Sequence, residues 1–300
     1  MYPRADYCGG GCVTVEIVQG DALKLLPGLA GERPNFVAAD PKFNLGKDYG
    51  AGVDDAMPAL EYRAWLHVFY ERCFKAAAED AVLYAFCGAD QIPLAWQAIA
   101  SAGWAYCQRL IWYGPNGMRR GRSARRPWAN LTENIVYALK GDGLPDAPHM
   151  PHYHDVLIVN RCQSNHPGSR FHVCQKPVRL YKLLLQAHEG IRRVLDPTAG
   201  SGSSLVACAE LGLDAIGIEI VPESAQLCRD RVAAAEAGLP YAQARQGQGG
   251  LFVAQGDSVT SGEPAAAGAA SVTPTAGGKD SGVGGGFPGK NRGVGGGSDG

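Results

Sequence analysis

Short apolar runs alternate along the chain with longer segments in which apolar side chains recur every three or four positions. A continuous run of four to eight apolar residues is typical of a strand buried on both faces, and the longer spacing is typical of an amphipathic helix. The runs predict strands at residues 13–18, 35–40, 81–87, 105–113, 134–139, 193–196 and 214–220. The periodic segments predict helices at residues 58–78, 91–101 and 177–188, with further helices beginning at Ser203 and after Pro222.

This alternation of strands and helices predicts the α/β fold class. The expected architecture is a mostly parallel seven-stranded sheet with helices on both faces. In open sheets of this kind, ligands bind at the carboxyl ends of the strands. Residues that directly follow a strand are therefore the first candidates for a functional site.

Composition divides the chain into three parts. Residues 246–300 carry many of the 41 glycines and almost no large apolar side chains, so we expect a disordered tail there. Residues 1–12, which contain CGGGC, are expected to form a flexible N-terminal arm. The remaining segment, residues 13–245, has the apolar content needed for one globular domain.

Overall composition narrows the class of protein. The chain is 46% hydrophobic and 19% charged, and it has no apolar run long enough to cross a bilayer. The first residues lack the pattern of a signal peptide, so we expect a cytoplasmic protein. Nine scattered cysteines then indicate reduced thiols rather than disulfides.

The net charge of −1 conceals two stretches without acidic residues, at 91–132 and 156–188. Basic residues gathered in this way can bind a polyanion, but they can also form a solvated loop. The pattern alone leaves both interpretations open. The first stretch contains six arginines, which are Arg109, Arg119, Arg120, Arg122, Arg125 and Arg126.

A glycine-rich turn follows the predicted strand at 193–196, in the segment VLDPTAGSGSSLVACAELGLDAIGIEI. Gly200 and Gly202 would let the backbone approach a ligand closely, and Glu219 ends the next strand, where an acid can bind both hydroxyls of a ribose. The segment predicts a nucleoside-binding βαβ unit. Because the full G-x-G-x-x-G spacing is missing, a cofactor with a single nucleoside is favoured over a pyrophosphate cofactor. A turn without a ligand is the alternative.

A second polar signature, ADPKF, closes the predicted strand at 35–40. The Asp40 carboxylate, the Pro41 carbonyl and the Phe43 ring can together grip the edge and the face of a flat, amino-substituted ring. Asp-Pro after a strand is also a common turn initiator. Both interpretations fit this short motif.

Together with RFHVCQKPVRLYKLLL before the glycine turn, these segments resemble the beta-class DNA amino-methyltransferases, which methylate adenine N6 or cytosine N4. In that family a D-P-P-[FYW] motif comes first, and the S-adenosylmethionine loop comes last, after an H-P-x-Q-K-P segment. The same order occurs here, and the likeness covers most of residues 13–235. It implies a Rossmann-like, S-adenosylmethionine-dependent methyltransferase fold with a circularly permuted order of motifs.

The resemblance also assigns roles to individual residues. Asp40 and the Pro41 carbonyl would accept hydrogen bonds from the target amino group, and Phe43 would stack on the flipped base. The cofactor would lie against Asp21, Asp196, Thr198, Gly200, Gly202, Glu219, His172, Gln175 and Lys176. The DNA backbone would be held by Arg119, Arg120, Arg122, Arg125 and Arg126.

The function implied is site-specific methylation of adenine N6 in duplex DNA, with cytosine N4 as the alternative. A short insertion at residues 141–170 would recognise the target sequence. The resemblance allows two further partners, a second copy of the chain and a cognate restriction nuclease.

One position departs from the family pattern, because Lys42 stands where the family has a second proline. Its ammonium group could pair with Asp40, and the chain would then be a DNA-binding protein with weakened or lost turnover. Alternatively, Lys42 points to solvent or to a DNA phosphate and leaves the motif intact. The sequence does not decide between these hypotheses.

Histidines and cysteines gather between residues 149 and 174, which raises the question of zinc. Their spacing fits no common structural zinc pattern, and scattered histidines in a polar loop more often meet solvent or phosphate. We therefore predict no metal site and keep zinc as the alternative. The residues concerned are His149, His152, His154, Cys162, His166, His172 and Cys174.

Overall fold

The computed structural model describes residues 13–49, 52–53, 55–117, 130–147, 154–162, 172 and 174–244. Its strands are β1 (Val15–Gln19), β2 (Phe36–Ala39), β3 (Val82–Cys87), β4 (Ala105–Tyr113), β5 (Thr132–Leu139), β6 (Val156–Ile158), β7 (Arg193–Asp196) and β8 (Asp214–Glu219). Its helices are α1 (Ala22–Leu25), α2 (Ala59–Ala76), α3 (Ile92–Ser101), α4 (Val178–Leu185), α5 (Ser203–Leu211) and α6 (Pro222–Glu236). Short 3₁₀ turns lie at Leu26–Gly28 and Ala89–Gln91.

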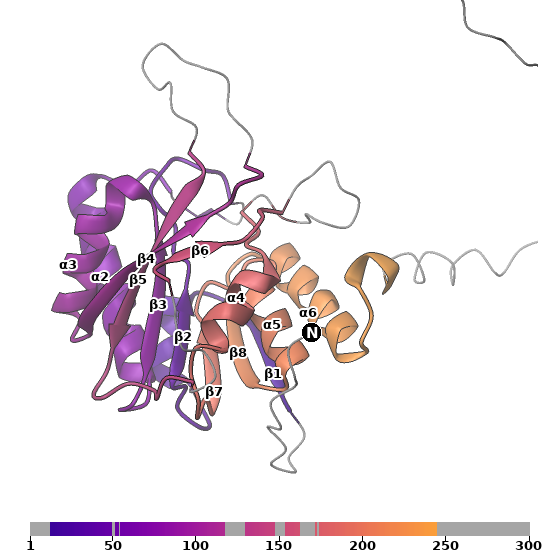
Figure 1. The fold of residues 1–300 in the computed structure, drawn as a ribbon. Coiled ribbons are helices and arrows are strands. Elements are labelled where there is room, and N and C mark those ends of the chain that lie inside the picture. The colour runs from indigo at the N-terminus through magenta and orange to yellow at the C-terminus, as the bar shows by residue number, and fades with distance from the viewer. Residues whose placement is uncertain are drawn as a thin grey trace, which may run out of the picture. The chain divides into compact units, whose positions relative to one another are not determined.

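The strands form one sheet in the order β1-β8-β7-β2-β3-β5-β4-β6 (Figure 1). All neighbouring pairs are parallel except β3 with β5 and β5 with β4, so β5 runs against the other strands of the described sheet. The α/β class and the mostly parallel sheet are confirmed. The predicted number of seven strands was too low, because β6 adds an eighth strand beside β4.

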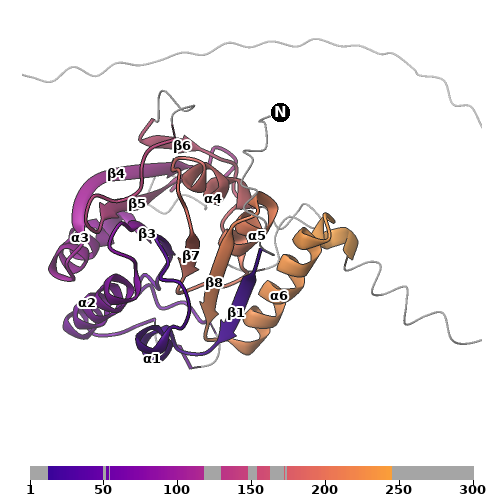
Figure 2. The same ribbon diagram turned by 90° about the horizontal axis from the view of Figure 1, so that it is seen from below.

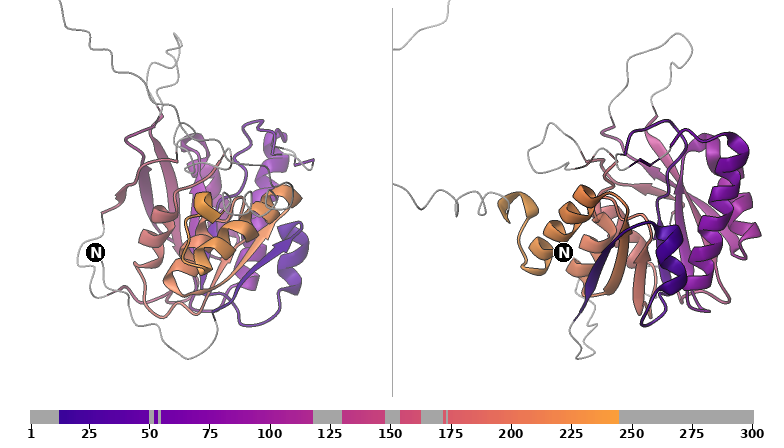
Figure 3. Two further views of the ribbon diagram at one scale, coloured as in Figure 1. Left: turned by 90° about the vertical axis from the view of Figure 1, so that its right-hand side faces the viewer. Right: turned by 180° about the vertical axis from the view of Figure 1, so that it is seen from behind.

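Helices cover both faces of the sheet, as Figure 2 shows. The helices α1, α2 and α3 lie on one face, and α4, α5 and α6 lie on the other. In the side views of Figure 3, α6 packs over β1 and β8. A strand between two helical layers buries both of its faces, which explains why β2 and β3 are apolar at nearly every position.

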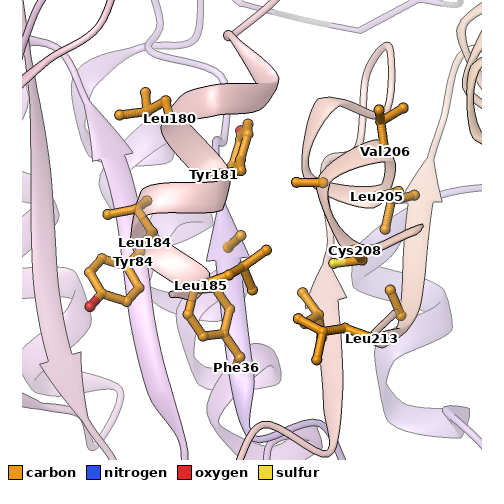
Figure 4. Packing of buried hydrophobic residues seen from close by; sticks show 14 of the residues in the cluster. Phe36, Tyr84, Leu180, Tyr181, Leu184, Leu185, Leu205, Val206, Cys208 and Leu213 are labelled. Atoms are coloured by element: carbon orange, nitrogen blue, oxygen red, sulfur yellow. The ribbon is translucent and has the colours of Figure 1, made fainter. Parts of the chain in front are cut away.

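The alternation along β2 shows how each face is filled. Phe36 and Ala38 belong to the cluster under α4 and α5, whereas Val37 and Ala39 belong to the cluster under α2 and α3. In the first cluster, Phe36 and the Tyr84 ring on β3 lie beneath Leu184 and its neighbours on α4 (Figure 4). This packing holds the last turn of α4 against the amino end of β2.

Several predictions about the ends of the chain lie outside the described residues. The expected arm at residues 1–12 and the whole of the expected tail at residues 246–300 fall there, as do parts of the insertion at residues 141–170. All of the described residues belong to one compact unit, which contains the sheet. Of the helices that the structure describes, none combines the length and the apolar character that a membrane crossing requires.

Candidate active site

Four adjacent parallel strands, β1, β8, β7 and β2, end at the same edge of the sheet. Asp21 follows β1, Glu219 ends β8, Thr198 lies just after β7, and Asp40 directly follows β2. These residues line one cavity of about 520 Å³ at that edge. The fold therefore brings segments that are far apart in the sequence to one place.

Asp40 is linked to both halves of the site. Its backbone N–H donates a hydrogen bond to Thr198 Oγ1 at 3.1 Å, which joins the end of β2 to the turn after β7. Its carboxylate Oδ2 lies 2.6 Å from the ammonium Nζ of Lys176. The same Nζ lies 2.7 Å from Oε1 of Glu133, so one ammonium group stands between two carboxylates.

All three of these side chains are largely removed from water. The exposed fraction is 8% for Lys176, 19% for Asp40 and 15% for Glu133. Burial is the largest influence on Asp40 and raises the pKa of its carboxyl group, and Lys176 acts in the opposite direction. Burial disfavours the ammonium form of Lys176, but the two carboxylates outweigh it and raise the pKa of the lysine. Lys176 is therefore charged.

The turn after β7 is held in shape by Glu219. One carboxylate oxygen accepts the Gly200 N–H at 2.7 Å, and the other accepts the Val221 N–H at 2.8 Å. Burial raises the pKa of Glu219, although these amide bonds favour the charged form. Gly200 has φ of +53°, and a Cβ there would meet nothing closer than Thr198 O at 4.0 Å. The backbone at Gly200 is thus open to a ligand in the cavity.

Two residues of the same turn lie behind it rather than in the cavity wall. Asp196 is buried and accepts hydrogen bonds from the Thr198 N–H at 3.0 Å and from the Ser204 hydroxyl. Burial raises the pKa of Asp196 to about 7. Gly202 has φ of +75° and packs against Cys228 on α6. Both residues set the shape of the turn from behind.

The position of Lys42 bears on the hypothesis that it pairs with Asp40. Its Nζ lies 4.7 Å from the centre of the Trp65 ring, and its backbone carbonyl accepts a hydrogen bond of 2.7 Å from Tyr62 Oη. Among the described residues, the ion pair of Asp40 is with Lys176. The next residue, Phe43, lines the cavity, and Gln91 holds its carbonyl at 3.1 Å.

A family model described as DNA methylase matches residues 35–230, well over half of the chain. The chain belongs to the DNA methylase family. A relative, the type II methyltransferase M.HpaI of Haemophilus parainfluenzae, is 26% identical over 233 residues, which cover 72% of this methylase and 73% of the relative. The DNA adenine methyltransferase YhdJ of Escherichia coli K12 is 25% identical over 239 residues, covering 69% and 79%.

Solved structures share the fold of this methylase. The PvuII DNA methyltransferase, described as cytosine-N4-specific, superposes with a TM-score of 0.61 at 16% identity and covers 78% of this chain and 93% of its own. The predicted membership of the amino-methyltransferase family and the predicted fold are confirmed. The methylase is a DNA amino-methyltransferase that uses S-adenosylmethionine.

The cavity fits S-adenosylmethionine, which carries an adenosine and a positively charged sulfonium. At one end, the Glu219 carboxylate and the open backbone of Gly200 suit a ribose. At the other end, Asp40 and Glu133 supply negative charge around a single lysine. The donor set of the methylase therefore matches both parts of the cofactor.

The remaining predicted site residues fall into two groups, those expected beside the cofactor and those expected to bind DNA. Asp21, His172, Gln175 and Lys176 line the cavity with the residues already placed there. Asp21 also caps α1, because its Oδ1 accepts the Leu23 N–H at 2.9 Å. The five arginines expected to bind DNA, from Arg119 to Arg126, lie outside the described residues.

The zinc alternative is tested only in part. Among the residues that the structure describes, no group of three or more side chains able to hold a metal occurs. Of the seven histidines and cysteines considered, His149, His152 and His166 lie outside the described residues.

Glu133 and Arg161 are among the residues of the cavity wall that the sequence analysis did not single out. Glu133 lies near the start of β5, and because β5 is antiparallel its start meets the carboxyl ends of the parallel strands. The signal was present, since Glu133 ends a long acid-free stretch. Arg161 lies 4.4 Å from the centre of the Trp112 ring and 3.8 Å from Glu133, and Asn116 holds its backbone N–H and carbonyl.

Proposed function

We propose that the methylase transfers a methyl group from S-adenosylmethionine to N6 of adenine in duplex DNA. The observation that carries the proposal is Asp40, a carboxylate at a strand end in the same cavity as the glycine turn. In the family that the chain resembles, aspartate at this position is commoner in adenine enzymes, whereas cytosine-N4 enzymes often have serine. The similarity to an enzyme named as a DNA adenine methyltransferase also supports adenine.

The chemistry required of the protein is mainly positioning. An exocyclic amine conjugated to its ring is a poor nucleophile. Asp40 and the Pro41 carbonyl would accept its two protons, which draws the nitrogen towards tetrahedral geometry and frees its lone pair. S-Adenosylmethionine supplies the methyl group on a cationic sulfur. The amine nitrogen gains the N–C bond as the S–C bond breaks, and it loses one proton to solvent.

The Phe43 ring would stack on the base and fix its plane. Alignment of this kind alone can be worth about 7–11 kcal/mol of the barrier. Because a paired base cannot reach the cavity, the target must flip out of the duplex at a cost of a few kcal/mol. We assign the backbone contacts that hold the opened duplex to the arginines from Arg119 to Arg126. A homodimer and a cognate nuclease remain predictions of the resemblance.

Cytosine N4 is the second candidate target. The superposition with a cytosine-N4-specific enzyme favours it, because that enzyme shares the fold of this methylase. The two acceptors Asp40 and Pro41 suit either amino group, so the shape of the base pocket must discriminate between the bases.

The test is transfer from S-adenosylmethionine with a deuterated methyl group to unmethylated genomic DNA, followed by digestion and mass spectrometry of the nucleosides. We expect labelled N6-methyldeoxyadenosine. Label found only in N4-methyldeoxycytidine would replace the proposal with the second candidate. If no nucleoside carries label while calorimetry still detects S-adenosylmethionine binding, methyl transfer to DNA is excluded.

A further inference from the structure

Three charged side chains that lie together in the cavity wall come from three separate parts of the fold. Asp40 follows β2, Glu133 belongs to β5, and Lys176 precedes α4. The Nζ of Lys176 lies 2.6 Å from Asp40 Oδ2 and 2.7 Å from Glu133 Oε1. The trio carries a net charge of −1 in a place that is largely closed to water.

We propose that Lys176 and Glu133 are positioning residues for the acceptor Asp40. Glu133 anchors the ammonium of Lys176, and the ammonium holds Oδ2 of Asp40. The Asp40 carboxylate thus stays ionised, and its Oδ1 is available to the target amino group. This inference rests on the role proposed above for Asp40. It moves Lys176 from the cofactor, where the family resemblance placed it, to the base acceptor.

Aromatic rings fix the same ammonium from another side. Lys176 Nζ lies 5.6 Å from the centre of the Phe43 ring and 5.0 Å from that of Phe86. Within about 6 Å, a cation is attracted to the face of such a ring. Phe43 is the ring proposed to stack on the base, so Lys176 ties the acceptor and the stacking surface together.

The second carboxylate explains how an ion pair can coexist with substrate binding. A lysine that belonged to Asp40 alone would compete with the target amine for the carboxylate. Because Glu133 shares the ammonium, Asp40 keeps part of its negative charge for the substrate. Without Lys176, two buried carboxylates would face each other, and one of them would take up a proton. A protonated Asp40 is a poorer acceptor for an amino group.

The surroundings of Asp40 limit what else can titrate it. The charged groups that act on it are Lys176, Glu133 and Lys47, and it interacts in turn with buried Asp196. The nearby phenols and thiol are Tyr49, Tyr70, Tyr181 and Cys87, whose pKa values are all raised by burial, so they are neutral near pH 7. Of the three charged groups, Lys176 and Glu133 act on Asp40 more strongly than Lys47 does, so their removal should move its titration most.

The test follows the Asp40 carboxyl carbon by NMR in full-length protein labelled with ¹³C at the aspartate carboxyl groups. Asp40→Asn assigns the resonance. Lys176→Met should raise the titration midpoint of Asp40 by about one to three pH units, and Glu133→Gln should lower it by about one. Lys75→Met removes a lysine that is 69% exposed and lies 2.7 Å from Glu71, and this control should not move the midpoint.

Methyl transfer measured against pH gives a second readout. The acidic limb of the profile of kcat against pH should move to higher pH in Lys176→Met and to lower pH in Glu133→Gln. At the plateau, kcat should fall about tenfold or more in both variants, because the acceptor is no longer held in place. The Kd of S-adenosylmethionine should change less than kcat does, since Glu219 and Gly200, which suit the ribose, are unaltered in both variants.

Lys176→Arg keeps the positive charge, and it provides a second variant in case Lys176→Met does not fold. Its Asp40 midpoint should stay within about half a unit of that of the unaltered protein. Midpoints that do not move in Lys176→Met and Glu133→Gln would overturn the inference, as would a loss of cofactor affinity in Lys176→Met with no change in Asp40. Failure of the unaltered protein to methylate DNA would refute the proposed function. The NMR titration would still decide whether Lys176 positions Asp40.

Discussion

Helix α5 is flanked at both ends by glycines with left-handed backbone, and the surroundings of these two glycines differ. Gly202 has φ of +75° and Gly212 has φ of +71°. A Cβ on Gly202 would overlap Cys228 Sγ and lie 3.1 Å from Cys228 Cβ, whereas a Cβ on Gly212 would meet nothing within 4 Å. Alanine at either position suffers backbone strain, but only Gly202→Ala also forces α5 and α6 apart.

The expected losses follow from these two terms. Left-handed backbone costs an alanine about 1–2 kcal/mol, which is the whole effect expected for Gly212→Ala. Overpacking of a filled interior adds about 1–3 kcal/mol, so Gly202→Ala should cost about 2–5 kcal/mol in total. Gly202 also closes the turn that lines the cavity, so its substitution should weaken S-adenosylmethionine binding and that of Gly212 should not.

Urea unfolding gives the free energies of unfolding, and calorimetry gives the cofactor affinity. Adding Cys228→Ala to Gly202→Ala should restore part of the loss, because the overlapping sulfur is gone while the close Cβ remains. Equal losses in Gly202→Ala and Gly212→Ala would refute the steric argument, and so would a double variant with no recovery.

Three further predictions concern the site itself. Asp40→Asn should abolish detectable methyl transfer to DNA, because the carboxylate is the proposed acceptor for the target amine, while calorimetry should still detect S-adenosylmethionine binding through Glu219 and Gly200. Retained transfer would exclude Asp40 as the essential acceptor. Burial raises the pKa of Asp196 from 3.8 to about 7, so the native state keeps a proton that the unfolded chain releases, and stability falls as pH rises through that interval. Urea midpoints of Asp196→Asn between pH 4.5 and 7.5 should therefore decline less than those of the unaltered protein, and parallel curves would contradict this. Tyr62→Phe removes the hydrogen bond to the Lys42 carbonyl, worth about 1 kcal/mol, and should lower kcat severalfold; an unchanged kcat would show that the loop needs no such anchor.

The strands that stand out most plainly in the sequence are β2 and β3, which are buried on both faces. β2 is apolar at all four positions because each of its faces meets a helical layer, and a run of this kind is visible without any knowledge of its partners. β6 has three residues that are partly or fully exposed, and it exists because it pairs with Ile111, Trp112 and Tyr113 of β4. The run VLIV at residues 156–159 is apolar, but it is short and lies inside the segment 141–170 that the sequence analysis assigned to target recognition.

The residues of the site also differ in how well the sequence predicts their position. Asp40, Thr198 and Glu219 are predictable neighbours, since each lies at or just beyond the carboxyl end of a strand in a parallel sheet. Glu133 reaches the cavity only because β5 is inserted antiparallel next to β3, which is a tertiary event. The sequence left the direction of the Lys42 side chain open, because closeness in sequence to Asp40 does not fix it. In the structure its Nζ lies 4.7 Å from the centre of the Trp65 ring on α2, and Lys176 forms an ion pair with Asp40.

The order of motifs along the chain matters less than the order of strands in the sheet. β2 and β7 are separated by most of the domain in sequence, yet they are adjacent and parallel, and the Asp40 N–H reaches Thr198 Oγ1 at 3.1 Å. Moving the chain ends to other loops would leave these pairings unchanged, because each strand would keep its neighbours and its direction. A permuted chain can therefore build the same edge, with the base acceptor beside the cofactor turn.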